Sequence, residues 1–248
     1  MKKNILVTGA GKGIGNKILF DCLENFDFVY AIIRSKKDFQ NLNKKVNKDK
    51  CKLYLGDISN IKLIEKVLLD SKKINKNING IVNNAGERLR ENFLKINKIQ
   101  INDIFKNNFF NHFYLMQKVI ADLKKNSTKK PISIVNIGSI VGVKGFNQLS
   151  GYASAKSALE GLTKSLAVEF ASDQIRFNIV HPGFIKTSYY ENFKKKQKKL
   201  YKWTVQKTPL GKWGESEDIS ELVMFLLSDK SKYITGQSIC VDGGWTAS

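Results

Sequence analysis

The chain has 248 residues, a length that fits a single domain with a full hydrophobic core. Its formal net charge is +20, yet only four of its 42 basic residues are arginines. This composition favours a lysine-rich surface exposed to solvent over a surface that binds nucleic acid. The other interpretation is that the positive charge attracts an acidic partner. The three cysteines, Cys22, Cys51 and Cys240, lack metal-ligand spacing, so we expect neither a metal site nor a disulfide framework.

No apolar run is long enough to span a bilayer, so we expect no membrane anchor. Met1-Lys2-Lys3 leads directly into the first predicted strand, which leaves no room for a signal peptide. Together with the scattered cysteines, this predicts a cytoplasmic protein.

Apolar runs and amphipathic stretches alternate along the chain. We expect strands at 4–7, 28–33, 51–55, 79–83, 132–137, 175–181 and 237–241. We expect helices near 14–24, 38–46, 60–71, 98–124, 152–171 and 216–228. This order predicts the α/β class: one doubly wound domain over residues 1–248, with a seven-stranded, mostly parallel sheet and helices on both faces. Ligands bind beyond the carboxyl ends of the strands in such sheets.

A glycine-rich loop lies between the first predicted strand and the first predicted helix. It reads Thr8-Gly9-Ala10-Gly11-Lys12-Gly13-Ile14-Gly15. The glycines permit a tight turn and a close backbone approach to a ligand, and the helix N-terminus directs unpaired N–H groups at a phosphate. Such a loop alone could be an ordinary turn, but its place at the start of a βαβ pattern favours a dinucleotide site.

A second motif, Tyr152-Ala153-Ser154-Ala155-Lys156, opens a later predicted helix. Its phenol and ammonium are one helical turn apart, where the cation can lower the pKa of the phenol. Alone, the pair would more often be a surface contact. Combined with the glycine loop, it indicates carbonyl–alcohol redox chemistry with a nicotinamide cofactor.

From Lys3 to Gly244 the chain resembles the short-chain dehydrogenase/reductase family, whose fold is of the Rossmann type. Besides the two motifs above, the resemblance rests on Asn83-Asn84-Ala85-Gly86, Gly138-Ser139, Pro182-Gly183 with Thr187, and the segment 235–244. The Tyr-x-x-x-Lys spacing is similar to the ketoreductase branch rather than to the enoyl reductases.

The resemblance implies a catalytic set of Asn108, Ser139, Tyr152 and Lys156. Tyr152 would exchange a proton with the substrate oxygen, Ser139 would orient that oxygen, and Lys156 would bind the nicotinamide ribose. Asn108, chosen over its neighbour by its spacing from the Asn-Asn-Ala-Gly motif, would support a water chain to Lys156. The two histidines, His112 and His181, are interpreted as packing or loop residues and receive no catalytic role.

The expected cofactor is NADP(H), with NAD(H) as the alternative. The second predicted strand ends in Ile33-Arg34-Ser35, without the acidic residue that usually binds the ribose 2′-hydroxyl of NAD. Arg34 and Ser35 could instead bind a 2′-phosphate, assisted by Lys12; alternatively Arg34 stacks on the adenine. The cofactor-binding set is Thr8, Gly9, Gly11, Lys12, Gly13, Ile14, Gly15, Arg34, Ser35, Asp57, Ile58, Asn84, Ala85, Gly86, Tyr152, Lys156, Pro182, Gly183, Ile185 and Thr187.

The substrate is less well defined by the sequence. The overall pattern is similar to that of 3-oxoacyl-carrier-protein reductases, whose acidic carrier-bound substrates would suit a lysine-rich surface. Leu149, however, stands where many such reductases have glutamine, and similar motifs occur in reductases of sugars, polyols and surface-glycan precursors. The lysine- and aromatic-rich segment at about 184–207 is expected to form a substrate lid.

By resemblance, the chain self-associates into a homotetramer through the predicted helices 98–124 and 152–171. A protein that uses this fold as a nucleotide sensor or a nucleic-acid-binding scaffold is the alternative to an enzyme. The intact Tyr152 and Lys156 favour the enzyme.

Overall fold

The computed structural model describes residues 3–125, 131–188 and 190–248, which contain one seven-stranded sheet. The strands are β1 (Asn4–Thr8), β2 (Phe28–Ile33), β3 (Cys51–Leu55), β4 (Gly80–Asn83), β5 (Ile132–Ile137), β6 (Ile175–Pro182) and β7 (Ser238–Val241). Their order is β3-β2-β1-β4-β5-β6-β7, and every neighbouring pair is parallel. The predicted doubly wound sheet is therefore confirmed.

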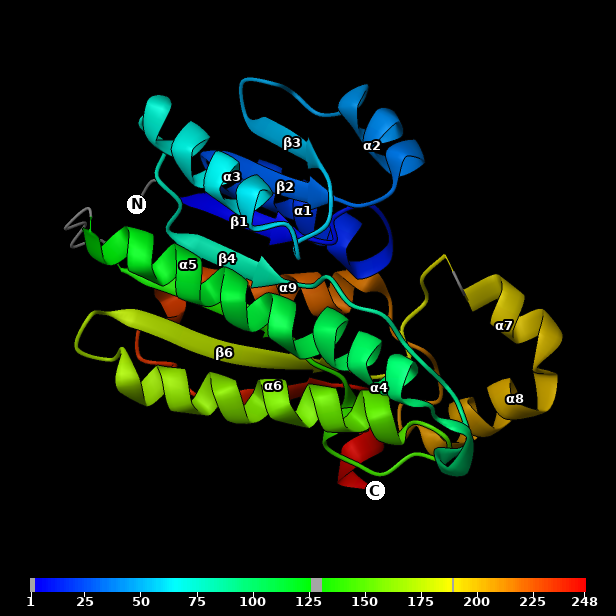
Figure 1. Cartoon of the computed structure of the whole chain (residues 1–248). Coiled ribbons are helices and arrows are strands. Elements are labelled where there is room, and N and C mark those ends of the chain that lie inside the picture. Colours follow the sequence, from blue (N-terminus) through cyan, green and yellow to red (C-terminus); the bar gives the residue numbers. More distant parts are fainter. Residues whose placement is uncertain (1–2, 126–130, 189) are drawn as a thin grey trace.

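Helices connect the strands (Figure 1). They are α1 (Gly13–Asn25), α2 (Lys36–Asn43), α3 (Ile61–Lys73), α4 (Lys98–Phe105), α5 (Asn111–Lys125), α6 (Ser150–Glu169), α7 (Tyr190–Lys196), α8 (Lys198–Lys207) and α9 (Ser216–Leu227). Within the described residues, every helix is too short or too polar to cross a lipid bilayer.

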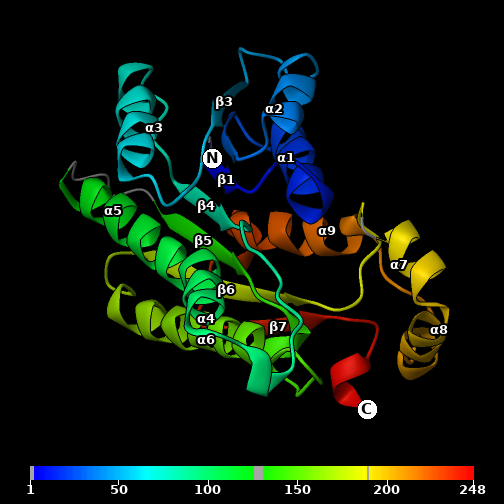
Figure 2. The same ribbon diagram turned by 45° about the vertical axis from the view of Figure 1, so that its right-hand side comes forward.

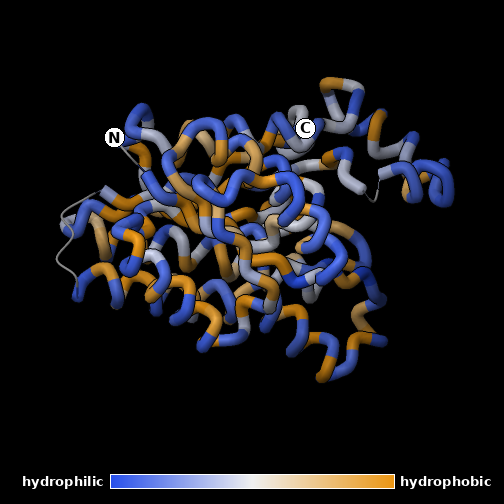
Figure 3. The backbone as a smooth tube through the Cα atoms, turned by 90° about the horizontal axis from the view of Figure 1, so that it is seen from above, coloured by the Kyte–Doolittle hydropathy of each residue, from blue (hydrophilic) through white to orange (hydrophobic). Residues whose placement is uncertain are grey.

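Two helical layers enclose the sheet, with α3, α5 and α6 on one face and α1, α2 and α9 on the other (Figure 2). Each layer has its own hydrophobic core because side chains alternate between the faces of a strand. Leu115 and Leu159 belong to the first core, and Leu19 and Val223 to the second. Figure 3 shows hydrophobic and hydrophilic stretches alternating along the peripheral helices, as expected for helices that bury one side.

β1 and β4 are neighbours at the centre of the sheet, and the strand order runs outward from them in opposite directions. The connections leaving these strands diverge to opposite faces and leave a crevice at the carboxyl edge, where doubly wound proteins bind ligands. The glycine loop follows β1 and the Asn-Asn-Ala-Gly motif follows β4, so the topology brings these two motifs together.

The predicted continuous helix 98–124 is wrong at its centre. The structure divides it into α4, a π-helical turn at Lys106–Phe110, and α5. The buried Asn108 lies in this turn, and its side-chain amide donates to the carbonyl oxygens of Ile104 (3.0 Å) and Glu87 (2.8 Å). A wider turn of this kind inside a helix often marks a functional site.

Other element boundaries shift by at most three residues from the sequence prediction. The helix expected at 38–46 is α2 and begins at Lys36, because the Ser35 hydroxyl caps it by accepting from Asp38 N at 3.2 Å. The segment expected to cover the substrate contains α7 and α8, which project from one end of the sheet (Figure 1).

Candidate active site and cofactor pocket

The glycine loop and the β4 loop are joined by hydrogen bonds at the carboxyl edge of the sheet. Thr8 Oγ1 donates to Val82 O and accepts from the backbone N–H groups of Asn84 (3.0 Å) and Ala85 (3.2 Å). The Asn84 side-chain amide donates to the carbonyl oxygens of Thr8 (3.2 Å) and Gly9 (3.1 Å). Thr8 therefore fixes the loops rather than lining the pocket between them.

Glycine is required in this loop for two reasons. Gly9 and Gly13 have φ values of +65° and +57°, which L-residues rarely adopt. A Cβ on Gly15 would lie 2.3 Å from both the Asn84 amide nitrogen and the Gly9 oxygen. Lys12, at the N-terminus of α1, provides no side-chain cap. The first-turn N–H groups and the Cβ-free cradle fit the pyrophosphate of a dinucleotide.

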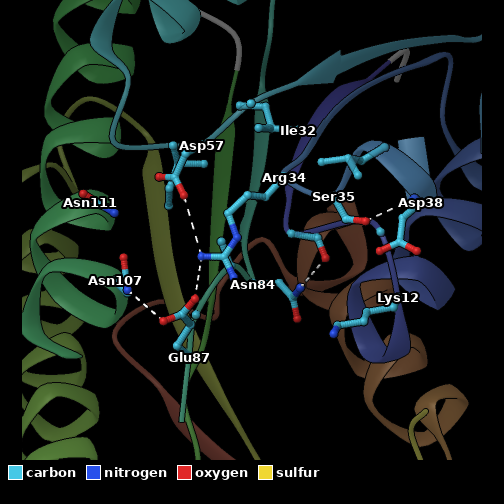
Figure 4. Close-up of a pocket in the computed structure, with 17 residues that line it drawn as sticks. Lys12, Ile32, Arg34, Ser35, Asp38, Asp57, Asn84, Glu87, Asn107 and Asn111 are labelled. Carbon is cyan, nitrogen blue, oxygen red and sulfur yellow. Dashed lines mark hydrogen bonds and ion pairs between the residues drawn. The ribbon is translucent and has the colours of Figure 1, made fainter. Parts of the chain in front are cut away.

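A pocket of about 320 Å³ opens between these loops (Figure 4). Among the predicted cofactor-binding residues, it is lined by Gly9, Gly11, Lys12, Arg34, Ser35, Asp57, Ile58, Asn84, Ala85 and Gly86. The lining also includes residues outside the predicted cofactor-binding set, namely Ile32, Ile33, Asp38, Gly56, Glu87, Asn107 and Asn111. Glu87 directly follows the Asn-Asn-Ala-Gly motif, so its position in the sequence could have identified it as a pocket residue.

Arg34 is already engaged in this pocket. Its Nη1 lies 2.5 Å from Glu87 Oε1 and 3.8 Å from Asp57 Oδ2, and Asn107 Nδ2 donates to the other Glu87 oxygen at 3.0 Å (Figure 4). The sequence predicted that Arg34 and Ser35 bind a 2′-phosphate. In this structure the guanidinium is balanced by two carboxylates and the Ser35 hydroxyl caps α2, so a phosphate would have to compete with Glu87.

The predicted catalytic residues come together beside the end of β5. Tyr152 and Lys156 lie on α6, and Lys156 Nζ is 5.8 Å from the centroid of the Tyr152 ring. Ser139 follows β5, and its hydroxyl is close enough to Tyr152 to lower the pKa of the phenol. Lys156 is buried, with 3% of its surface exposed, and its ammonium donates to Ile137 O at 2.9 Å. Desolvation lowers the pKa of Lys156 to about 8.

The cation that acts on the Tyr152 phenol in this structure is Arg88 rather than Lys156. Desolvation raises the pKa of the phenol above its ordinary value, opposed by the charge of Arg88 and by the hydrogen bond with Ser139. The Lys156 ammonium is directed at a backbone carbonyl oxygen instead. Tyr152 therefore holds its proton at neutral pH.

Asn108 contacts the loop after β4. Its Oδ1 accepts from Glu87 N at 3.2 Å, and its amide donates to Glu87 O at 2.8 Å. A Cβ on Gly86 would lie 2.7 Å from Asn108 Oδ1 and 3.6 Å from Lys156 Nζ. Glycine thus allows Asn108 and Lys156 to approach each other, while Asn108 itself hydrogen-bonds the backbone of Glu87 and Ile104.

The remaining predicted cofactor residues lie outside the pocket lining. Thr187 is beside the glycine loop, 3.3 Å from the position of a Cβ on Gly13. Gly183 packs against Asp242, and Ile185 forms an isolated parallel bridge with Gly214. These contacts place the segment after β6 beside the crevice.

Both histidines are buried. His112 Nε2 donates to Ala85 O at 2.7 Å, and burial lowers the pKa of this imidazole to about 3, so it stays neutral. His181 contacts the backbone of Ser139. Across residues 3–125, 131–188 and 190–248, no three His, Cys, Asp or Glu side chains gather as a metal ion would require.

Comparisons with known proteins agree with this geometry. A family model described as Enoyl-(Acyl carrier protein) reductase matches residues 9–246. The 3-oxoacyl-[acyl-carrier-protein] reductase FabG of Buchnera aphidicola subsp. Schizaphis graminum is 34% identical over 246 residues, covering 98% of this chain and 97% of the relative. A tropinone reductase homolog of Arabidopsis thaliana is also 34% identical, over 251 residues, covering 98% and 92%.

Solved structures match over the whole chain. ElxO with NADP bound has a TM-score of 0.91 at 28% identity, and 4-hydroxyisoleucine dehydrogenase complexed with NADH has 0.89 at 28%; both matches cover 100% of each chain. These similarities agree with the glycine cradle and the Tyr152–Lys156 pair. The chain belongs to the short-chain dehydrogenase/reductase family and is an NAD(P)(H)-dependent oxidoreductase.

Proposed function

We propose that the protein is an NADP(H)-preferring ketoreductase acting on 3-oxoacyl substrates, with Asn108, Ser139, Tyr152 and Lys156 as its catalytic residues. The observation that carries the proposal is the contact between the Ser139 hydroxyl and Tyr152, with the buried Lys156 ammonium 5.8 Å from the ring centroid. A carbonyl oxygen placed against both hydroxyl groups would be oriented and supplied with a proton.

The protonation state of the site suits reduction. Because desolvation raises the pKa of Tyr152, the phenol is available as a proton donor at neutral pH. Ser139 holds the substrate oxygen, and the positive charge of Arg88 stabilises the phenolate left after proton transfer. The bound nicotinamide would supply the hydride to the carbonyl carbon. Asn108 fixes the loop after β4 by holding the Glu87 backbone.

The preference for NADP(H) rests on Arg34, Ser35 and Lys12, which line the pocket near the end of β2. A guanidinium binds phosphate in a bidentate manner, and the second strand ends without a carboxylate. Asp57 and Glu87 oppose this preference by pairing with Arg34. NAD(H) is the alternative, and binding titrations with NADPH and NADH distinguish the two.

The substrate class rests on the relatives and on charge. Several of the similar curated proteins are 3-oxoacyl-[acyl-carrier-protein] reductases, and the net charge of +20 would attract an acidic carrier. The lysine-rich α7 and α8 would form the substrate lid. A small hydroxylated substrate is the second candidate, favoured by the full-length match to 4-hydroxyisoleucine dehydrogenase and by the buried Leu149 just before the catalytic helix.

The test is turnover of acetoacetyl-CoA with NADPH and with NADH, for the wild type and Tyr152→Phe. We expect NADPH-dependent reduction that falls about 100-fold or more in the variant, because the proton donor is removed. NADPH binding by the variant, followed by cofactor fluorescence, should remain. Wild-type turnover of small hydroxylated substrates alone would favour the second candidate, and failure to bind either cofactor would contradict the proposal.

A further inference from the structure

His181 is a buried histidine to which the proposed chemistry assigns no role. It lies near the end of β6, on the face covered by α6, and none of its surface is exposed. Desolvation lowers its pKa below the ordinary value, so the imidazole is neutral at physiological pH. The charged groups that act on it are Glu160, Lys156 and Lys164, all on α6.

The imidazole continues the hydrogen-bonding ladder between β5 and β6. Gly138 N donates to Val180 O at 2.7 Å, and the next backbone donor, Ser139 N–H, points at His181 Nδ1 at 3.1 Å. Ser139 O is also 3.0 Å from Nδ1, but a neutral ring nitrogen either accepts or donates. The second side of the ring therefore determines which of these two bonds forms.

Glu160 lies on that second side. Its Oε2 is 3.4 Å from His181 Nε2, while its Oε1 accepts from Lys164 Nζ (2.6 Å) and the Ser238 hydroxyl (2.9 Å). A carboxylate favours a protonated Nε2 and repels a bare one. With the proton on Nε2, Nδ1 is an acceptor and the partly buried Ser139 N–H is satisfied; the other tautomer would donate to Ser139 O and leave that N–H without this acceptor.

The spacing on α6 connects this arrangement to the active site. Tyr152, Lys156 and Glu160 are four residues apart and share one side of the helix. Lys156 holds Ile137 O, and Glu160 acts on Ser139 N–H through His181. Gly138 lies between these contacts, and a Cβ there would be 2.4 Å from His181 Nδ1. The end of β5 is thus held by two successive turns of the helix that carries Tyr152.

We infer that Glu160 and His181 are positioning residues for Ser139: Glu160 selects the Nε2–H tautomer of His181, and Nδ1 fixes the Ser139 backbone so that its hydroxyl meets Tyr152. The inference rests on the proposed catalytic role of Ser139.

The pair His181→Asn and His181→Gln separates the two contacts of the ring. The asparagine Oδ1 can occupy the position of Nδ1 and accept from Ser139 N–H, whereas glutamine places its amide at the position of Nε2. We expect His181→Gln to lower kcat for carbonyl reduction by about 10- to 100-fold, as misplaced groups do. We expect His181→Asn to keep most of the wild-type kcat.

NADPH dissociation constants should change less than about twofold in both variants, because His181 is not part of the pocket lining. Equal losses of kcat in the two variants, or a loss explained by weaker NADPH binding, would overturn the inference. Glu160→Gln should lower kcat as well, while Glu169→Gln, an exposed control at the end of the same helix, should not.

A second measurement needs no turnover and no variant. Nitrogen-15 NMR of the histidine rings at pH 7 reports which ring nitrogen carries the proton. We expect His181 to be protonated on Nε2 in the wild type, and protonation on Nδ1 would overturn the inference. If the expected tautomer is found but no carbonyl substrate is turned over, the proposed function fails while the Glu160–His181–Ser139 arrangement stands.

Discussion

At the scale of single residues, the environment of each ionisable group sets its protonation state more than its residue type does. Tyr152 and Lys156 are both desolvated, and burial moves their pKa values in opposite directions because it disfavours whichever form is charged. The phenol keeps its proton, and the ammonium becomes easier to deprotonate. The pair is thus arranged for proton donation to a carbonyl.

The pH dependence of reduction should follow Lys156. Its pKa is lowered from 10.5 to about 8, so its positive charge is present below this pH and lost above it, while Tyr152 remains protonated. We expect kcat/KM for carbonyl reduction to be level at neutral pH and to fall by about tenfold per unit well above pH 8. A profile that stays level to pH 10 would show that the ammonium is not required.

Glu87 should act against the 2′-phosphate of NADP(H), because it holds the guanidinium of Arg34 at 2.5 Å. The Arg34 side chain is 61% exposed and that of Glu87 41%, so their ion pair is weak in solvent. We expect Glu87→Gln to tighten NADPH binding about two- to fivefold and to change NADH binding less. Equal tightening of both cofactors, measured by titration, would argue against competition at the 2′ position.

At the scale of elements, glycines decide where helices and strands can approach each other. Gly15 is in the first turn of α1, where a Cβ would overlap Asn84 and Gly9. Gly161 is exposed in the interior of α6, where a Cβ would meet no atom within 4 Å among the described residues. The same residue type therefore has a steric role in one helix and only an entropic cost in the other.

These two glycines make a matched pair for alanine substitution. We expect Gly15→Ala to abolish NADPH binding and to lower the free energy of unfolding, because the added methyl forces the loops apart. We expect Gly161→Ala to raise the free energy of unfolding by about 0.5–1 kcal/mol with unchanged NADPH affinity. Urea titration and cofactor binding check both outcomes, and tolerance of Gly15→Ala would refute the steric argument.

At the scale of the whole molecule, exposed apolar side chains lie on the helical layer formed by the π turn, α5 and α6. Phe110 is 43% exposed, Tyr114 51% and Val168 81%. Exposed apolar side chains grouped on one face mark candidate protein–protein contacts. We propose that this layer carries the contacts of a homotetramer.

Light scattering in solution tests the assembly. We expect the mass of four chains, and Val168→Glu should shift the population toward smaller species because it places a charge in an apolar contact. A monomeric wild type would remove the proposed tetramer. An unchanged mass in the variant would move the contact away from α6.

Sequence patterns alone predicted the parallel sheet, its two helical layers, the glycine cradle and the Tyr152–Lys156 pair. Each of these depends on local chemistry: alternating apolar runs, Cβ-free turns, or residues one helical turn apart. Their order along the chain was sufficient to predict that they meet at the carboxyl edge of the sheet.

Which side chains face each other across that edge depends on the three-dimensional arrangement of the strands and loops. Arg34 meets Glu87 because the loops after β2 and β4 flank the same pocket, and His181 meets Ser139 because β5 and β6 are neighbours. The π turn at Asn108 likewise depends on a hydrogen bond to the distant Glu87. Such contacts depend on strand order and burial, and those same quantities set the pKa values of Tyr152 and Lys156.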